Sequence, residues 1–168
     1  LNKYQELNKL FIGNAFVEYL ALGKLKNIAY IASQRLNKIS NGHYALTVNE
    51  SGDFLIIDNF NNGETRRSAT LSGGESFLVS LSLALALSSQ IQLKSKSSLE
   101  FFFLDEGFGT LDNQLLDRVI SSLESLRDNE KMNIGLITHV EELKERVPRK
   151  LIVNPPISGE CGTKVSLI

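Results

Sequence analysis

The sequence predicts an α/β domain with a mainly parallel sheet flanked by helices, preceded by a helical region and a small β-hairpin. From Ser72 onwards, helical and strand patterns alternate, which is typical of a parallel sheet with helices on its faces. Residues Phe101 to Leu104 form a continuous apolar run, as expected of a central strand covered on both faces. With 168 residues, 42% of them apolar, the chain is large enough for one domain with its own core.

The N-terminal part is predicted to contain two helices followed by short strands. Apolar residues recur at helical spacing in 1–11, and a longer helix is expected at 15–39. The apolar face of this longer helix comprises Ala21, Leu25, Ile28, Ala32, Leu36 and Ile39. Strands are expected at 44–48 and 54–58 on either side of a hairpin turn, with a third short strand before Ser72.

The C-terminal part is predicted to alternate between helices and strands. Helices are expected at 73–91, at 113–126 and from Glu141, and strands at 101–104, 134–138, 150–153 and 164–168.

Charge and composition exclude some classes of function. The formal net charge of −1 gives no overall basic signal for nucleic acid, so any DNA contact must come from a local patch. Three basic residues fall near one face of the long helix: Lys24, Arg35 and Lys38. This cluster could contact the phosphates of a nucleic acid, or it could simply be the solvent-exposed face of the helix. The single cysteine, Cys161, fits a reducing compartment, and the apolar stretch 77–87 is too short to span a bilayer. We therefore expect a cytoplasmic protein without a membrane segment.

The strongest local motif is a serine followed by two glycines and a glutamate. Ser72 and Glu75 have the spacing of a capping box at the start of a helix. That interpretation leaves Gly73 and Gly74 unexplained, because each costs a helix about 1 kcal/mol relative to alanine. Bare amides at a helix N-terminus bind anions, so a phosphate site is the functional alternative.

An acidic pair follows the apolar run. Asp105 and Glu106 stand where a buried parallel strand ends, which is where α/β folds bind ligands. Asp105 would hold Mg²⁺, which prefers oxygen ligands, and Glu106 would orient an attacking water. The alternative is an ordinary strand that meets polar residues at the surface.

Two further positions are weaker signals when each is taken alone. Asp112 is a good N-cap for the helix that follows it, and this structural role is the simpler explanation. His139 follows the strand at 134–138, so it would stand at the same sheet edge as Asp105. His139 either has a structural role or could contact the phosphate of the same ligand as Asp105.

In this order and spacing, the motifs resemble the C-terminal lobe of the ABC-type ATPase heads of the SbcC family and its SMC-like relatives. Leu71 to Glu75 is similar to the signature motif, and Phe101 to Glu106 to the Walker B strand. Gly109 to Asp112 is similar to the D-loop, and His139 to the switch histidine. The resemblance extends upstream through residues 31–44 and covers nearly the whole chain.

The resemblance implies a head that binds ATP and Mg²⁺ together with an N-terminal ATPase lobe. Asp105 would bind the metal, and Glu106 and His139 would act on the nucleotide of the same head. The remaining cofactor-binding residues would be Ser72, Gly73, Gly74, Glu75 and Asp112. Among them, Ser72 and Gly74 would face the nucleotide held by a second copy, giving an ATP-dependent homodimer.

One departure from the family pattern limits this chain. A P-loop needs Gly-x-x-x-x-Gly-Lys-Ser/Thr, but Gly23-Lys24 is followed by Leu25. We expect the isolated chain to be an inactive fragment, as the start at Leu1 also suggests. Residues 1–13 would be the base of a returning coiled coil, and 14–168 the C-terminal ABC ATPase lobe.

The resemblance also implies partners, and it leaves rivals open. An SbcC-type complex would process double-stranded DNA ends with an SbcD-type nuclease. The alternatives are the ATPase lobe of another SMC-like chromosome-maintenance protein and the nucleotide-binding domain of an ABC transporter. Transporter domains usually carry Gln where this chain has Glu75, and the long helix and hairpin before Leu71 also argue against them.

Overall fold

The computed structural model describes residues 2–11, 14–94, 100–130, 132–147, 149–156 and 162–168. Cys161, Leu1 and residues 12–13 of the predicted coiled-coil base lie outside the described residues. The helices are α1 Asn2–Phe11, α2 Ala15–Ile39, α3 Gly73–Lys94, α4 Asn113–Glu130 and α5 Glu141–Arg146. The strands are β1 Tyr44–Val48, β2 Phe54–Asp58, β3 Glu64–Arg67, β4 Phe101–Asp105, β5 Asn133–Ile137, β6 Leu151–Asn154 and β7 Lys164–Leu167. Each predicted helix and strand is therefore present, with small changes at the ends.

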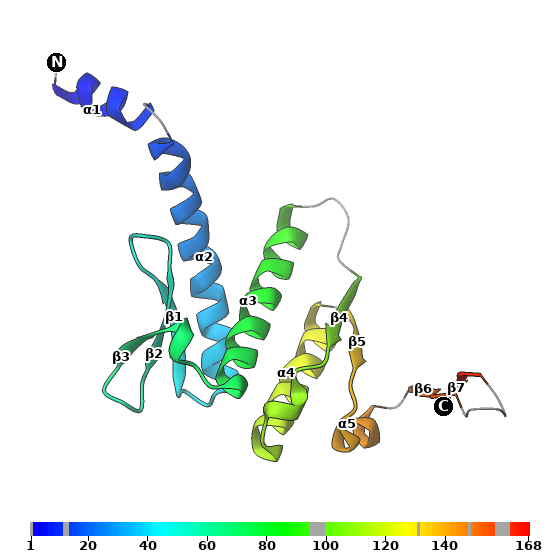
Figure 1. Ribbon diagram of the computed structural model, residues 1–168. Coiled ribbons are helices and arrows are strands. Elements are labelled where there is room, and N and C mark those ends of the chain that lie inside the picture. Colours follow the sequence, from blue (N-terminus) through cyan, green and yellow to red (C-terminus); the bar gives the residue numbers. More distant parts are fainter. Residues whose placement is uncertain (1, 12–13, 95–99, 131, 148, 157–161) are drawn as a thin grey trace.

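The core lies around α2 and α3, which pack side by side with the β1–β3 sheet on the other side of α2 (Figure 1). The predicted apolar face of α2 is confirmed at its C-terminal end, where Ala32, Leu36 and Ile39 are buried. It is wrong at Ala21, which is exposed, because α2 extends beyond the sheet and α3 (Figure 1). By length and composition α3 resembles a membrane-spanning helix, but much of its apolar surface packs into this core.

The expectation of a mainly parallel sheet is wrong for the described residues. β1, β2 and β3 pair antiparallel, as do β6 and β7, and only β4 and β5 pair parallel. The reason is the length of the connections. Short turns join β1, β2 and β3 and permit only antiparallel neighbours, whereas α4 provides the crossover that a parallel pair needs.

The coverage of β4 also differs from the expectation. Phe102 and Leu104 pack against the core, but Phe101 and Phe103 are 58% and 69% exposed. Their rings stack with centroids 6.3 Å apart and stay largely open to solvent. The apolar run thus predicted a strand buried on both faces, whereas this chain buries only one of them.

Packing between helices engages one of the three basic residues on α2 that could contact phosphate. The Arg35 guanidinium donates a hydrogen bond of 2.6 Å to the Ser89 hydroxyl on α3. Arg35 therefore joins α2 to α3, while Lys24 and Lys38 remain exposed on α2. This favours packing over phosphate binding as the role of Arg35.

Candidate functional site

The serine–glycine turn begins α3 and faces solvent. Ser72 and Gly73 are exposed, and Gly74 is half-buried. The capping box is confirmed, since the Glu75 amide donates to Ser72 Oγ at 3.3 Å and the Ser72 amide donates to Glu75 Oε2 at 2.7 Å. The amides of Gly73 and Gly74 belong to the first turn of the helix, where an N–H has no intrahelical acceptor. They remain available to an anion.

Packing within the chain also helps to explain the glycines. A Cβ at Gly74 would lie 3.2 Å from the carbonyl oxygen of Thr110, and one at Gly73 would lie 3.4 Å from Thr110 Cγ2. Any larger residue at Gly74 would push against a backbone atom. The sequence pattern explained the glycines by a ligand alone, because the contact with the 108–111 turn joins residues far apart in the chain.

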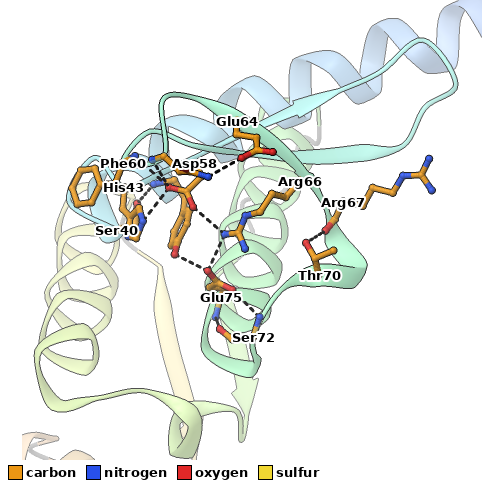
Figure 2. Close-up of polar contacts among 12 residues, drawn as sticks. Ser40, His43, Asp58, Phe60, Glu64, Arg66, Arg67, Thr70, Ser72 and Glu75 are labelled. Atoms are coloured by element: carbon orange, nitrogen blue, oxygen red, sulfur yellow. Dashed lines mark hydrogen bonds and ion pairs between the residues drawn. The ribbon is translucent and has the colours of Figure 1, made fainter.

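The Glu75 carboxylate is held by three parts of the chain (Figure 2). The Tyr44 hydroxyl donates to Glu75 Oε1 at 2.6 Å, and the Arg66 guanidinium donates to the same oxygen at 3.0 Å. Burial favours the neutral form, but the hydrogen bonds from Tyr44, Ser72 and Arg66 outweigh it and lower the pKa of Glu75 to about 2. Burial and the bond to Glu75 together raise the pKa of Tyr44 to about 12. Glu75 is therefore an ionised anchor for the turn.

The network continues into the antiparallel sheet. Arg66 Nη2 also lies 3.3 Å from Asp58 Oδ2, and His43 Nε2 lies 3.2 Å from Asp58 Oδ1. The His43 ring stacks on the rings of Tyr44 and Phe60, with centroids 3.9 Å and 4.4 Å apart (Figure 2). The β1–β3 sheet thus supports the serine–glycine turn. Sequence reasoning missed this support, because no short-range pattern links residues so far apart.

The acidic pair lies at the carboxyl end of β4, as predicted. Asp105 is the last residue of the strand and is exposed. Glu106 follows with φ +58°, a left-handed conformation that is uncommon for a residue other than glycine. Its amide donates to the Ile137 carbonyl of β5 at 2.9 Å. The strand ends at this bend, and both acidic residues are exposed there.

His139 meets Glu106 at this edge. Parallel pairing places Asp105 opposite Ile137, so the residues that follow the two strands lie close together. His139 Nδ1 is 2.7 Å from Glu106 Oε2, within hydrogen-bonding distance, and both side chains are more than half exposed. Among the described residues, no hydrogen bond engages the other ring nitrogen, Nε2. The expectation that His139 shares the sheet edge with Asp105 is confirmed.

Asp112 caps α4. Its Oδ1 accepts a hydrogen bond of 2.8 Å from the Leu115 amide, which confirms the structural role. Asp112 also lines an open groove of about 510 Å³ together with the Ser72–Gly74 turn and Arg118. Asp105, Glu106 and His139 do not line this groove. The predicted residues therefore form two sets, one around the serine–glycine turn and one at the strand ends.

The strand-end set fits a magnesium site only if the ligand supplies part of the coordination. Among the described residues, no three His, Cys, Asp or Glu side chains are grouped to hold a metal ion. Mg²⁺ normally binds one or two carboxylates and completes its shell with waters and substrate phosphates. The exposed Asp105 fits this pattern, because its carboxylate leaves space for such ligands.

Comparison with known proteins identifies the family. The family described as SbcC/RAD50-like, Walker B motif, matches residues 44–125, which include the serine–glycine turn and β4. The SbcC component of the SbcCD nuclease from Clostridium acetobutylicum is 51% identical over 167 residues, covering 99% of this chain and 14% of the relative. This chain belongs to the SbcC family. The Bacillus subtilis counterpart is 49% identical over 99% of the chain and 15% of its own length.

A solved structure supports the fold of this SbcC-family chain. A protein from a study of ATP-driven dimerisation and DNA-stimulated activation of SMC ATPases superposes with a TM-score of 0.66. It is 18% identical, and the match covers 90% of this chain and 89% of that protein. This chain thus shares the fold of that protein. The chain spans only about one seventh of the length of its SbcC relatives.

Proposed function

We propose that this chain is the C-terminal half of an SbcC-type ATPase head and hydrolyses ATP only together with an N-terminal lobe that carries the P-loop. The observation that carries the proposal is the pairing of Glu106 with His139 at the exposed carboxyl ends of β4 and β5. The apolar face at Phe101 and Phe103 supports the need for a second lobe, because an uncovered face of this kind favours a packing partner.

The strand-end residues divide the chemistry. Asp105 would hold Mg²⁺, which when bound would neutralise charge on the phosphate oxygens of ATP. The Glu106 carboxylate, half exposed beside His139, would orient the attacking water. His139 keeps Nδ1 on Glu106, and its Nε2 would contact the phosphate. Both side chains are exposed in this chain, so closure against the nucleotide lobe would exclude water from them.

The serine–glycine turn serves the nucleotide of a second copy. Ser72, Gly73 and Gly74 offer a hydroxyl and bare amides at the positive end of α3, which suits a γ-phosphate. Glu75 contributes by holding this turn, since its own carboxylate is engaged within the chain. Asp112 lines the same groove and would face the same nucleotide. ATP would then join two heads, and hydrolysis would let them part.

The remaining partners follow from family membership. The relatives are components of the SbcCD nuclease, so an SbcD-type nuclease and double-stranded DNA ends are the proposed partner and substrate. Residues 1–13 would form the base of a coiled coil and 14–168 the ATPase lobe, in a cytoplasmic protein. The close identity to SbcC favours this assignment over another SMC-like ATPase or an ABC transporter domain.

The test uses Glu106→Gln in the full-length protein. Without the carboxylate that orients water, we expect ATP to remain bound and dimers to accumulate. Size-exclusion chromatography in ATP, with phosphate release measured in parallel, reads both effects. Glu124→Gln, the same change on an exposed face of α4, is the matched control. An unchanged monomer with normal turnover in Glu106→Gln would reject the assigned role.

A further inference from the structure

Phe77 lies at the junction of the two sets of site residues. It is on α3, one turn beyond the Ser72–Gly74 turn, and its ring covers the backbone of Gly107, the residue after Glu106. A Cβ at Gly107 would lie 2.5 Å from Phe77 Cδ2 and 2.6 Å from Cε2. The same ring meets Phe108 edge to face, with centroids 5.1 Å apart and planes at 61°. The ring therefore occupies the space that a side chain at position 107 would need.

The backbone beneath this ring is strained. Glu106 and Gly107 have φ values of +58° and +93°, two left-handed residues in succession. For a residue other than glycine, this conformation costs roughly 1–2 kcal/mol and persists only where the surroundings enforce it. On one side the Glu106 amide is held by the Ile137 carbonyl at 2.9 Å. On the other, Thr110 Oγ1 donates to the Gly107 carbonyl at 3.1 Å, and the Phe77 ring packs on Gly107.

The same helix also touches this segment at its first turn. A Cβ added at Gly73 would lie 3.4 Å from Thr110 Cγ2, and one added at Gly74 would lie 3.2 Å from the Thr110 carbonyl oxygen. Helix α3 therefore meets residues 107–110 at two points. Gly109, between these points, is close to His139, because a Cβ there would lie 3.6 Å from His139 Nε2. A displacement of the serine–glycine turn would therefore move Phe77 and, through Gly107, the Glu106–His139 pair.

We propose that Phe77 is a positioning residue that holds Glu106 in its reactive conformation and couples it to the serine–glycine turn. This inference rests on the proposed ATPase function. When the turn docks on the nucleotide of a second copy, α3 becomes fixed, and the ring of Phe77 then fixes the Gly107 backbone. Glu106 orients water for the nucleotide of its own head only while this contact persists. Each head thereby senses its neighbour before it hydrolyses ATP.

The experiment compares Phe77→Leu with Phe54→Leu in the full-length protein. Phe54 is a half-buried core residue on β2, outside the site, so the same chemical change controls for lost packing. We expect Phe77→Leu to keep ATP-dependent dimerisation and the KM for ATP, while kcat falls roughly ten- to hundred-fold through misplacement of Glu106. Phe54→Leu should keep its kcat within about twofold, because packing lost away from the site lowers stability rather than turnover.

A double-mutant cycle with Gly107→Ala provides a second readout. The new methyl group collides with Phe77, so Gly107→Ala alone should lower kcat strongly, whereas in the Phe77→Leu background its further effect should be smaller. Effects on kcat that simply multiply would overturn the inference. So would a Phe77→Leu protein that turns over like Phe54→Leu, or one that loses dimerisation along with kcat. If Phe77→Leu does not fold, Phe77→Met replaces it under the same criteria, since methionine fills similar volume without a planar ring.

The two proposals fail separately. If Glu106→Gln turns over normally, the proposed function itself is wrong. If Glu106→Gln abolishes turnover but Phe77→Leu matches its control, only the positioning role of Phe77 is wrong.

Discussion

Removal of the Tyr44 hydroxyl probes the network that supports the serine–glycine turn. Tyr44→Phe deletes a hydrogen bond of 2.6 Å to the ionised Glu75 and leaves the ring in place. The folded-state pKa of Glu75, about 2, lies below its ordinary value of 4.5, so its ionisation stabilises the fold above pH 4.5. That contribution is lost as the pH falls through 4.5 towards 2. The variant should therefore be destabilised at neutral pH and much less so near pH 2, where Glu75 is protonated in the folded state too.

The magnitude follows from the shift in pKa. If the loss of this donor raises the folded-state pKa of Glu75 from about 2 to about 3, the linkage relation gives a loss of about 1.4 kcal/mol at pH 7. The same relation still gives about 1.2 kcal/mol at pH 3.5 but only about 0.4 kcal/mol at pH 2, where Glu75 becomes protonated in the folded chain as well. Screening by solvent at this partly exposed site reduces the neutral-pH value to about 1 kcal/mol.

The assay is urea unfolding at pH 7 and at pH 2, followed by circular dichroism. Tyr30→Phe is the matched control, since Tyr30 is 63% exposed on α2 and should lose almost nothing on this change. A second check repeats Tyr44→Phe in a Glu75→Gln background, where its effect should nearly vanish. Equal losses at both pH values, or a loss at pH 7 no larger than that of Tyr30→Phe, would refute the reasoning.

Two further predictions concern nucleotide chemistry. The purified 168-residue chain should release no phosphate from ATP, because it has no P-loop to bind the nucleotide, and steady turnover would contradict this. In the full-length protein, Ser72→Arg should abolish ATP-dependent dimerisation while nucleotide binding persists, because a bulky cation replaces the hydroxyl at the exposed turn. Sizing in ATP and fluorescent-nucleotide titration measure the two effects, and normal dimers would argue against contact between copies.

Much of the fold was accessible from local patterns. The long helix α2 follows from spacing and terminators, and β1 and β2 from alternation and turn residues, because these signals act over a few residues. The pairing within the sheets was predicted less well. The parallel arrangement suggested by the helix–strand alternation holds only for β4 and β5, where α4 forms the crossover. Coverage of Phe101 and Phe103 also depends on what packs against this chain.

The residue types of the candidate site were visible in the chain as a capping box, an acidic pair after a strand, and a histidine after the next strand. Their joint arrangement was not visible, because it depends on contacts between residues far apart in sequence. Only the packed structure places Tyr44 and Arg66 on Glu75, His139 on Glu106, and Phe77 on Gly107. A helix start or a strand end is encoded by its neighbours in the chain, whereas the partners that hold it in place are brought together by the core.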